Sequence, residues 1–298
     1  MTPRLGRLIT AMVTPFAGDG SVDLDAVGRL ATYLVDVQGN DAIVVNGTTG
    51  ESPTTTEDEK FAVVEAALAA VGERATVIAG VGSFDTAHTV RMARRAAQVG
   101  APALLVVCPY YSKPSQAGIS AHFREVAEAT DLPVMMYDIP HRTGVPMTTA
   151  TLLALAEHPN LVAVKDAKGD LVASSEVIAA TDLDYYSGDD ALTLPLLSLG
   201  AVGVVGTSTH LTGAGMRAIL EAWAAGDHAE ALRLHQRWLP AFTGVFAAPG
   251  ATMVKAALAK RGLGDHGAVS AAVRLPMVEP ADDLVEAFLA AVDQASRG

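Results

Sequence analysis

The stretch Leu161-Val162-Ala163-Val164-Lys165-Asp166-Ala167-Lys168-Gly169-Asp170 shows how the chain is built. Its apolar run does not alternate with polar residues, which is typical of a strand buried on both faces. A charged, glycine-containing loop follows, and the next segment, Val172–Ala180, predicts a helix. The stretch therefore reads as one strand-loop-helix unit of a parallel sheet.

Similar units recur along the first two thirds of the chain. Apolar or β-branched runs predict eight strands: Arg7–Val13, Ala42–Asn46, Thr76–Val81, Ala103–Cys108, Val134–Tyr137, Val162–Lys165, Asp184–Ser187 and Val202–Thr207. Helical patterns lie between several of them: Asp58–Val71, Thr86–Val99, Gln116–Ala129, Thr149–Ala156 and Val172–Ala180. Eight strands alternating with helices are the number that closes a (β/α)8 barrel. The alternative, an open doubly wound sheet, would place a glycine-rich phosphate turn after the first strand, and Val13-Thr14-Pro15-Phe16 is not one.

The last third of the chain predicts helices without strands. They cover Met216–Ala225, His228–Leu239, Thr252–Ala259 and Asp282–Ala295, which is more than one closing helix requires. We therefore expect an α/β protein with a TIM barrel over residues 1–225 and a C-terminal helical extension over residues 226–298.

Composition limits the classes of function. The chain has 298 residues, of which 50% are hydrophobic, so it contains enough apolar material for a large core. A net charge of −12 and the absence of a basic, aromatic-interleaved patch argue against nucleic acid and anionic membranes as partners. We expect neither a secretory signal nor a membrane span. The single cysteine, Cys108, fits a reducing compartment, so we expect a cytoplasmic protein.

Lys165 is the most informative single residue. It ends an apolar strand, and the C-terminal ends of strands carry the catalytic groups of a (β/α)8 barrel. Burial there would lower the pKa of the amine, and a neutral amine can attack a carbonyl to form a Schiff base. The alternative is a buried ion pair with Asp166 or another inward acid, and the residues alone leave both open. Lys168, beside Gly169, is expected to be solvated.

Other strand ends and loops carry polar candidates. Arg142 has the geometry for bidentate carboxylate binding, although a structural salt bridge is equally compatible with its position. The phenols of Tyr137 and Tyr111 can relay protons, or simply pack. Thr48 and Thr49 offer hydroxyl and backbone N–H groups to a carboxylate, or form only a tight turn. The eight histidines show no metal-ligand spacing and no nucleotide motif follows a strand, so we expect neither a metal nor an organic cofactor.

Five blocks together resemble one family. GTTGES, PYYSKP, YDIPHRTG, VKDAKGD and YSGDDA occur in the order and at the spacing of the dihydrodipicolinate synthase family, the (β/α)8 Schiff-base lyases of the diaminopimelate route to lysine. The resemblance extends from Gly6 to Arg274-Leu275-Pro276. It implies condensation of pyruvate with L-aspartate β-semialdehyde, without a cofactor. Another pyruvate-dependent class I aldolase or dehydratase, or a catalytically inactive pyruvate-binding relative, are the alternatives.

The resemblance also implies a role for each matching residue. Lys165 forms the imine with pyruvate, and Tyr137 shuttles a proton at that imine. Thr49 links Tyr137 to Tyr111, which reaches into the site of a neighbouring subunit. Thr48 and Thr49 hold the pyruvate carboxylate. The family therefore implies a homo-oligomer whose minimal working unit is a dimer, with a dimer of dimers expected.

The position of Arg142 separates the branches of the superfamily. The resemblance implies that Arg142 receives the carboxylate of the semialdehyde, while Gly188 and Val205 line the pocket with backbone carbonyls. N-acetylneuraminate lyases have an apolar residue in place of Arg142, because their aldehyde brings no carboxylate there. An unpaired guanidinium would be costly in such a pocket, which favours the synthase.

The chain also departs from the family pattern. Residues 203–211 read GVVGTSTHL where many members have Ser-Val after the pocket-lining position. The backbone role of Val205 survives such a change, and the effect on the shape of the pocket is left open. Of a common Asn-Pro-x-x-x-Lys run only Lys255 is kept. The positions that match the family's allosteric lysine site are Glu57, Lys60, Phe84 and His88. The family's site uses His, Asn and Glu, and this chain has lost the Glu that would pair with the effector's amine. We therefore expect weak or absent inhibition by lysine.

Overall fold

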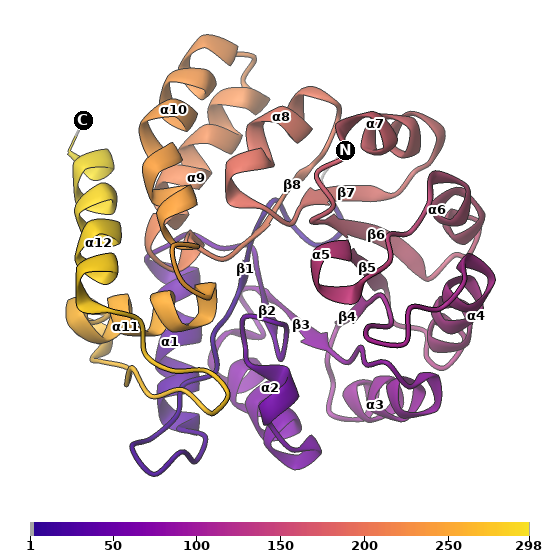
Figure 1. Ribbon diagram of the computed structural model, residues 1–298, viewed down its shortest axis with the longest axis horizontal. Helices are drawn as coiled ribbons and strands as arrows, with labels where there is room; N and C mark the ends of the chain where they lie inside the picture. The colour runs from indigo at the N-terminus through magenta and orange to yellow at the C-terminus, as the bar shows by residue number, and fades with distance from the viewer. Residues whose placement is uncertain (1–2, 298) are drawn as a thin grey trace. The chain divides into compact units, whose positions relative to one another are not determined.

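The computed structural model describes residues 3–297, and its eight strands form a closed barrel in sequence order (Figure 1). The strands are β1 Leu8–Ala11, β2 Ala42–Val45, β3 Thr76–Gly80, β4 Ala103–Val107, β5 Val134–Asp138, β6 Leu161–Asp166, β7 Asp184–Ser187 and β8 Gly203–Gly206. Each lies in or overlaps one predicted run. The expected fold class, a (β/α)8 barrel, is confirmed.

The absence of polar alternation in the strands reflects their burial. Every residue of β1, β2, β5, β6 and β8 is buried. The pairing is parallel, with Ile9 beside Ala42 and Leu104 beside Val134. Parallel strands with both faces covered read as continuous apolar runs, which is why the runs could be recognised.

The chain divides into two compact units. Within the described residues, one unit contains Ile78–Val205 with residues 3–4, and the other contains Leu5–Val77 with residues 206–297. The helices of the first unit are α3 Thr86–Gln98, α4 Gln116–Ala127, α5 Pro140–Thr143, α6 Thr149–Ala156, α7 Leu171–Ala180 and α8 Thr193–Ser198. Those of the second are α1 Leu24–Asp36, α2 Glu57–Val71, α9 Thr209–Ala224, α10 His228–Gly244, α11 Gly250–Arg261 and α12 Asp282–Ser296. The separation of a barrel over 1–225 from an extension over 226–298 stays a prediction.

Helices α2, α3, α4, α6 and α7 start and end within two residues of their predicted limits. The start of α2 has a capping box, in which Thr56 and Glu59 satisfy each other's backbone N–H groups. Three helices, α1, α5 and α8, were not predicted. The signal for α1 was present, since Asp23 caps the helix and Leu30 and Leu34 share its buried face.

All four helices of the last third are longer than predicted, and α9 and α10 differ most from their predicted ranges. α9 begins at Thr209 rather than Met216, although Gly213 and Gly215 lie in its first half. A Cβ at Gly215 would lie 2.1 Å from Cε2 of Trp238, so this glycine permits the close approach of α9 and α10 rather than ending a helix. α10 continues through Pro240 to Gly244 because the packing of Ala241 and Phe242 outweighs one lost hydrogen bond.

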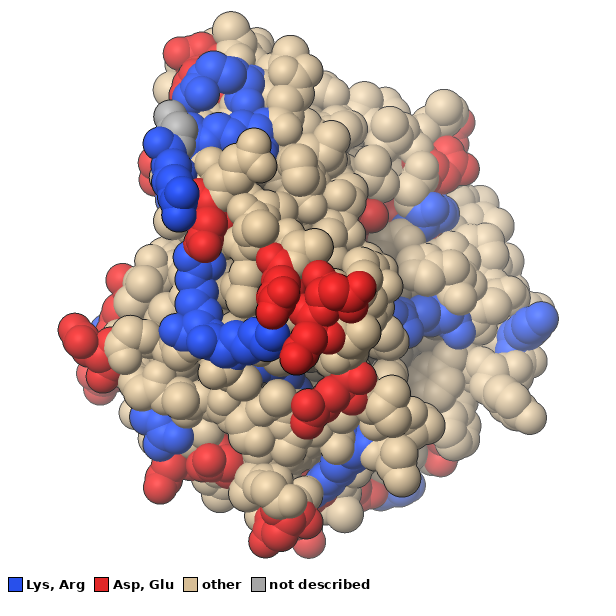
Figure 2. Space-filling model, turned by 60° about the vertical axis from the view of Figure 1, so that its left-hand side comes forward, with Lys and Arg blue, Asp and Glu red and all other residues tan. Residues whose placement is uncertain are grey.

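Charged side chains of both signs share the molecular surface. Figure 2 shows a band of basic side chains on one face with acidic side chains beside it. On the C-terminal helices, Arg233 pairs with Glu230 and Arg261 pairs with Asp293. Within residues 3–297, no helix is both long enough and apolar enough to cross a membrane.

Candidate active site

Lys165 and Tyr137 lie side by side at the C-terminal ends of neighbouring strands. The register of β5 and β6 pairs the two residues, and Nζ of Lys165 is 4.2 Å from the centre of the Tyr137 ring. Lys165 is 4% exposed and Tyr137 is 5% exposed. Burial lowers the pKa of Lys165 to about 8; Asp190 opposes this shift and the positive charge of Arg142 adds to it. The lysine therefore has the reactive amine that Schiff-base chemistry requires.

The alternative of an ion pair between Lys165 and Asp166 is not what the structure shows. Asp166 is the next residue on the strand, and successive side chains point to opposite faces. Its carboxylate accepts hydrogen bonds from Oγ of Ser174 at 2.6 Å, from the backbone N–H of Lys168 and from the hydroxyl of Tyr185. The acid whose charge acts on Lys165 is Asp190, which is buried and follows β7.

Arg142 and Tyr111 lie in the loops that follow β5 and β4. Arg142 is exposed on the single turn of α5, and its charge reaches Lys165 strongly enough to lower the pKa of that amine. Tyr111 is 92% exposed and has φ +71°, so the backbone turns this phenol away from its own core. The structure thus brings Arg142 towards Lys165 and directs Tyr111 into solvent.

Gly188 and Val205 are the predicted pocket-lining residues of the first unit. Gly188 donates its backbone N–H to the carbonyl of Asp166 at 2.7 Å. A Cβ on Gly188 would lie 2.9 Å from that oxygen, so the close backbone approach requires glycine. Val205 is buried in β8. Their role in lining the pocket stays a prediction.

Thr48 and Thr49 lie in the second unit, in the loop after β2. Thr48 is exposed, whereas Thr49 is buried. The hydroxyl of Thr14 donates to the carbonyl of Gly50 at 2.7 Å and fixes the loop to the chain after β1. Within this unit, the hydroxyl of Thr49 lies 3.4 Å from that of Thr207.

The segment after β8, which departs from the family pattern, contacts the loop after β2 through Thr207 and Thr49. Thr207 belongs to this segment, and it places a hydroxyl beside that of Thr49. His210 holds this segment, because its Nδ1 donates to the carbonyl of Thr207 at 2.8 Å and its Nε2 accepts from the N–H of Val13. Burial lowers the pKa of His210 to about 4, so the ring is neutral. Neither role was predicted, although the departure from the family pattern marked the segment.

A second missed cluster supports the Thr48–Thr49 loop. Glu51, at φ +53°, forms a buried ion pair with Lys255 of α11. Lys255 also donates to the carbonyl of Ala272 at 2.9 Å, and the N–H of Arg274 donates to Glu51 at 3.1 Å. The C-terminal segment is therefore anchored directly beside the loop.

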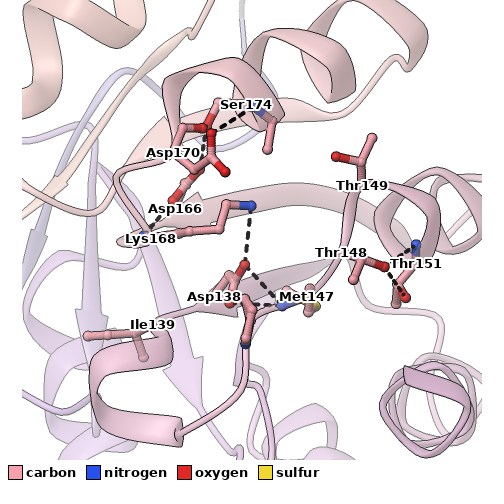
Figure 3. Close-up of polar contacts among 12 residues, drawn as sticks. Asp138, Ile139, Met147, Thr148, Thr149, Thr151, Asp166, Lys168, Asp170 and Ser174 are labelled. Carbon is pink, nitrogen blue, oxygen red and sulfur yellow. Dashed lines mark hydrogen bonds and ion pairs between the residues drawn. The ribbon is translucent and has the colours of Figure 1, made fainter. Parts of the chain in front are cut away.

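The expectation that Lys168 is solvated is wrong. Its side chain is 9% exposed, and Nζ lies 3.5 Å from a carboxylate oxygen of Asp138 (Figure 3). The adjacent Gly169 suggested an open loop, but the buried acid on the neighbouring strand draws the ammonium inward. Asp138 itself was not singled out from the sequence, although it lies within the YDIPHRTG block.

Cys108 directly follows β4 and is buried. Burial raises the pKa of Cys108 to about 12, so this thiol carries almost no reactive thiolate. In the described part of the chain, no group of three or more His, Cys, Asp or Glu side chains is arranged to hold a metal ion.

A (β/α)8 barrel with a buried lysine of lowered pKa on its sixth strand is typical of a lyase of the Schiff-base aldolase type. The chain belongs to the dihydrodipicolinate synthetase family, whose model matches residues 4–295.

Individual relatives are similar over nearly the whole length. The chain is 57% identical over 292 residues to the 4-hydroxy-tetrahydrodipicolinate synthase of Cutibacterium acnes, covering 98% of both chains. It is 61% identical over 258 residues to the synthase of Acidothermus cellulolyticus, covering 87% of this chain and 83% of that one. The structure of the dihydrodipicolinate synthase of Cyanidioschyzon merolae with lysine bound superposes with a TM-score of 0.94 at 40% identity, covering 99% of both chains.

Proposed function

We propose that this chain catalyses the 4-hydroxy-tetrahydrodipicolinate synthase reaction, in which pyruvate condenses with L-aspartate β-semialdehyde. The observation that carries the proposal is the buried Lys165 amine beside the Tyr137 ring, with the Arg142 charge acting on it. The names of the relatives and the family agree with this reaction. The route supplies diaminopimelate and lysine, and we place the enzyme in the cytoplasm.

The chemistry follows from these positions. The neutral amine of Lys165 attacks the ketone of pyruvate, and loss of water gives a protonated imine. The cationic imine acidifies the methyl group, and Tyr137 relays the proton that leaves it, so an enamine forms. The enamine carbon then adds to the aldehyde. Finally the amine of the semialdehyde substrate attacks the imine carbon and displaces Lys165, which closes the ring and frees the enzyme.

The remaining site residues bind the two substrates. We assign Thr48 and Thr49 to the pyruvate carboxylate, with Thr49 also continuing the proton relay. Gly188 and Val205 line the pocket through their backbone carbonyls. Arg142 receives the carboxylate of the semialdehyde, since a guanidinium forms two parallel hydrogen bonds to a carboxylate.

Replacing Arg142 with alanine tests the second substrate. We expect KM for the semialdehyde to rise about 10- to 100-fold, because a charge-assisted carboxylate contact is lost. Trapping the pyruvate adduct on Lys165 with borohydride should give the same mass shift in Arg142→Ala as in the unmodified chain. The rate is measured with a coupled reductase.

His141 provides the matched control for this substitution. It lies on the same turn of α5 and is also exposed, so His141→Ala should change KM by less than about twofold. Turnover of pyruvate with N-acetylmannosamine instead would place the chain in another branch of the superfamily. A trapped pyruvate adduct on Lys165 without turnover of either aldehyde would indicate a different second substrate. Absence of the adduct would indicate a catalytically inactive relative.

The position of Tyr111 supports assembly into a homo-oligomer. An aromatic side chain that is 92% exposed at φ +71° suits insertion into the site of a second copy, so we propose a dimer in which each Tyr111 completes the partner's relay. Elsewhere, Leu171, Val172 and Leu199 line an apolar hollow in which Val172 is 73% exposed. This hollow is a suitable contact between two dimers, and sedimentation measurements test the assembly.

Lysine is expected to have little effect on the rate. At the positions that match the family's regulatory site, His88 of α3 replaces the acid that would pair with the effector's amine, and an exposed Phe84 lies nearby in sequence. Rate assays over a range of lysine concentrations check this expectation. The positive control is the Cyanidioschyzon merolae synthase, whose structure has lysine bound. A steep inhibition curve at sub-millimolar lysine would contradict it.

A further inference from the structure

Two buried carboxylates directly follow the reactive pair. Asp138 comes after Tyr137 on β5, and Asp166 comes after Lys165 on β6, and the register pairs these two acids as well. Asp138 is 0% exposed and Asp166 is 2% exposed. Because successive side chains alternate, both acids lie on the face of the sheet opposite to Tyr137 and Lys165. Two neighbouring buried carboxylates repel each other, so each needs partners of its own.

Asp166 is held entirely by hydrogen-bond donors. Its carboxylate accepts from Ser174 of α7, from Tyr185 of β7 and from the backbone N–H of Lys168 at 2.6 Å. These contacts fix the start of the loop after β6. They also fix the backbone of Lys168 and therefore the position from which its side chain extends.

Asp138 connects both ends of the segment that carries Arg142. It precedes residue 139, and its two carboxylate oxygens accept from the N–H of Met147 at 3.2 and 3.3 Å, so one side chain spans residues 139–146. Within this segment the N–H of Arg142 donates to the carbonyl of Ile139 at 2.9 Å. Lys168 provides the cation, with Nζ 3.5 Å from Asp138, as Figure 3 shows.

We infer that Asp138 and Lys168 are a positioning pair for Arg142. Lys168 bridges the two loops, since its backbone binds Asp166 and its side chain binds Asp138. Asp138 in turn closes the segment 139–146 and thereby aims the guanidinium at the second substrate. Neither residue touches the reacting atoms. The inference rests on the proposed function, because it assumes a second substrate with a carboxylate.

The pair also introduces a pH dependence. Burial raises the pKa of Asp138 to about 6, with Lys168 opposing and Asp166 adding to the shift. The other titratable groups on which Asp138 acts are Cys108 and Tyr185, whose pKa values are both raised, so both stay neutral at pH 6. As pH falls through about 6, Asp138 gains a proton and its attraction for Lys168 is lost. The Arg142 segment then loses the charge that anchors it.

The test compares Asp138→Asn, Lys168→Met and the double variant. Each single change leaves one charge buried without its partner, and we expect KM for L-aspartate β-semialdehyde to rise about tenfold. The pyruvate adduct trapped on Lys165 should form as in the unmodified enzyme. The double variant removes both charges, so its KM should lie below the product of the two single effects. Asp131→Asn, an exposed acid before β5, is the control.

A pH profile of KM distinguishes the proposed positioning role of Asp138 from a purely structural role. In the unmodified enzyme, KM for the semialdehyde should rise as pH falls below about 6, and in Asp138→Asn that rise should be absent. Unchanged KM for the semialdehyde in both single variants would overturn the inference. A loss of the pyruvate adduct as large as the effect on KM would also overturn it. If the unmodified enzyme does not turn over the semialdehyde at all, the proposed function has failed instead.

Discussion

Replacing Lys165 with methionine should abolish turnover. Methionine fills a similar volume in the buried position but has no amine, so no imine can form. We expect kcat to fall by at least about 10⁴-fold, because removing a covalent nucleophile removes the whole reaction path. Mass spectrometry after borohydride treatment with pyruvate should show an adduct on the unmodified chain and none on the variant. An adduct on Lys165→Met would contradict the assignment.

The pH dependence of the unmodified enzyme provides a second measurement on the same residue. With its pKa lowered to about 8, Lys165 is neutral in roughly one molecule in ten at pH 7, against about one in three thousand for an ordinary lysine. The neutral form attacks pyruvate, so kcat/KM for pyruvate should rise with pH to about 8 and then level off. Because the Arg142 charge contributes to lowering this pKa, Arg142→Ala should shift the profile to higher pH.

Replacing Lys255 with methionine should have the largest effect on stability. Lys255 is 0% exposed and forms a buried ion pair with Glu51, so its removal leaves an uncompensated carboxylate in the core. We expect the free energy of unfolding to fall by about 3–5 kcal/mol, measured by urea denaturation. KM for pyruvate should rise as well, because Glu51 follows the Thr48–Thr49 loop in the sequence.

An exposed lysine on the same helix provides the matched control. Lys260 of α11 pairs with Asp282 and Glu286, and its side chain is 35% exposed. Lys260→Met should therefore cost no more than about 1 kcal/mol. In a chain that also carries Glu51→Gln, Lys255→Met should cost less than it does alone. Equal losses for Lys255→Met and Lys260→Met would show that burial of the Glu51–Lys255 pair is unimportant.

The predictable part of the fold had local signals. Continuous apolar runs marked most of the eight strands because both faces of a barrel strand are covered. The errors occurred where packing decided the outcome. The helix predicted to begin at Met216 begins at Thr209, and Gly215 within it allows Trp238 to pack against α9. The helix predicted to end at Leu239 continues through Pro240 to Gly244, because Ala241 and Phe242 are buried.

The candidate site shows the same division. Lys165 could be found because a lysine at the end of an apolar strand is unusual, and the sequence alone determined its place, the strand order and the family blocks around it. Only the tertiary structure decided that Lys168 turns inward to Asp138, that Glu51 meets Lys255, and that Thr207 approaches Thr49. Glu51 and Lys255 are 204 residues apart, and Thr49 and Thr207 are 158 apart. Such contacts have no periodicity, because they depend on where the closed barrel brings separate strand ends.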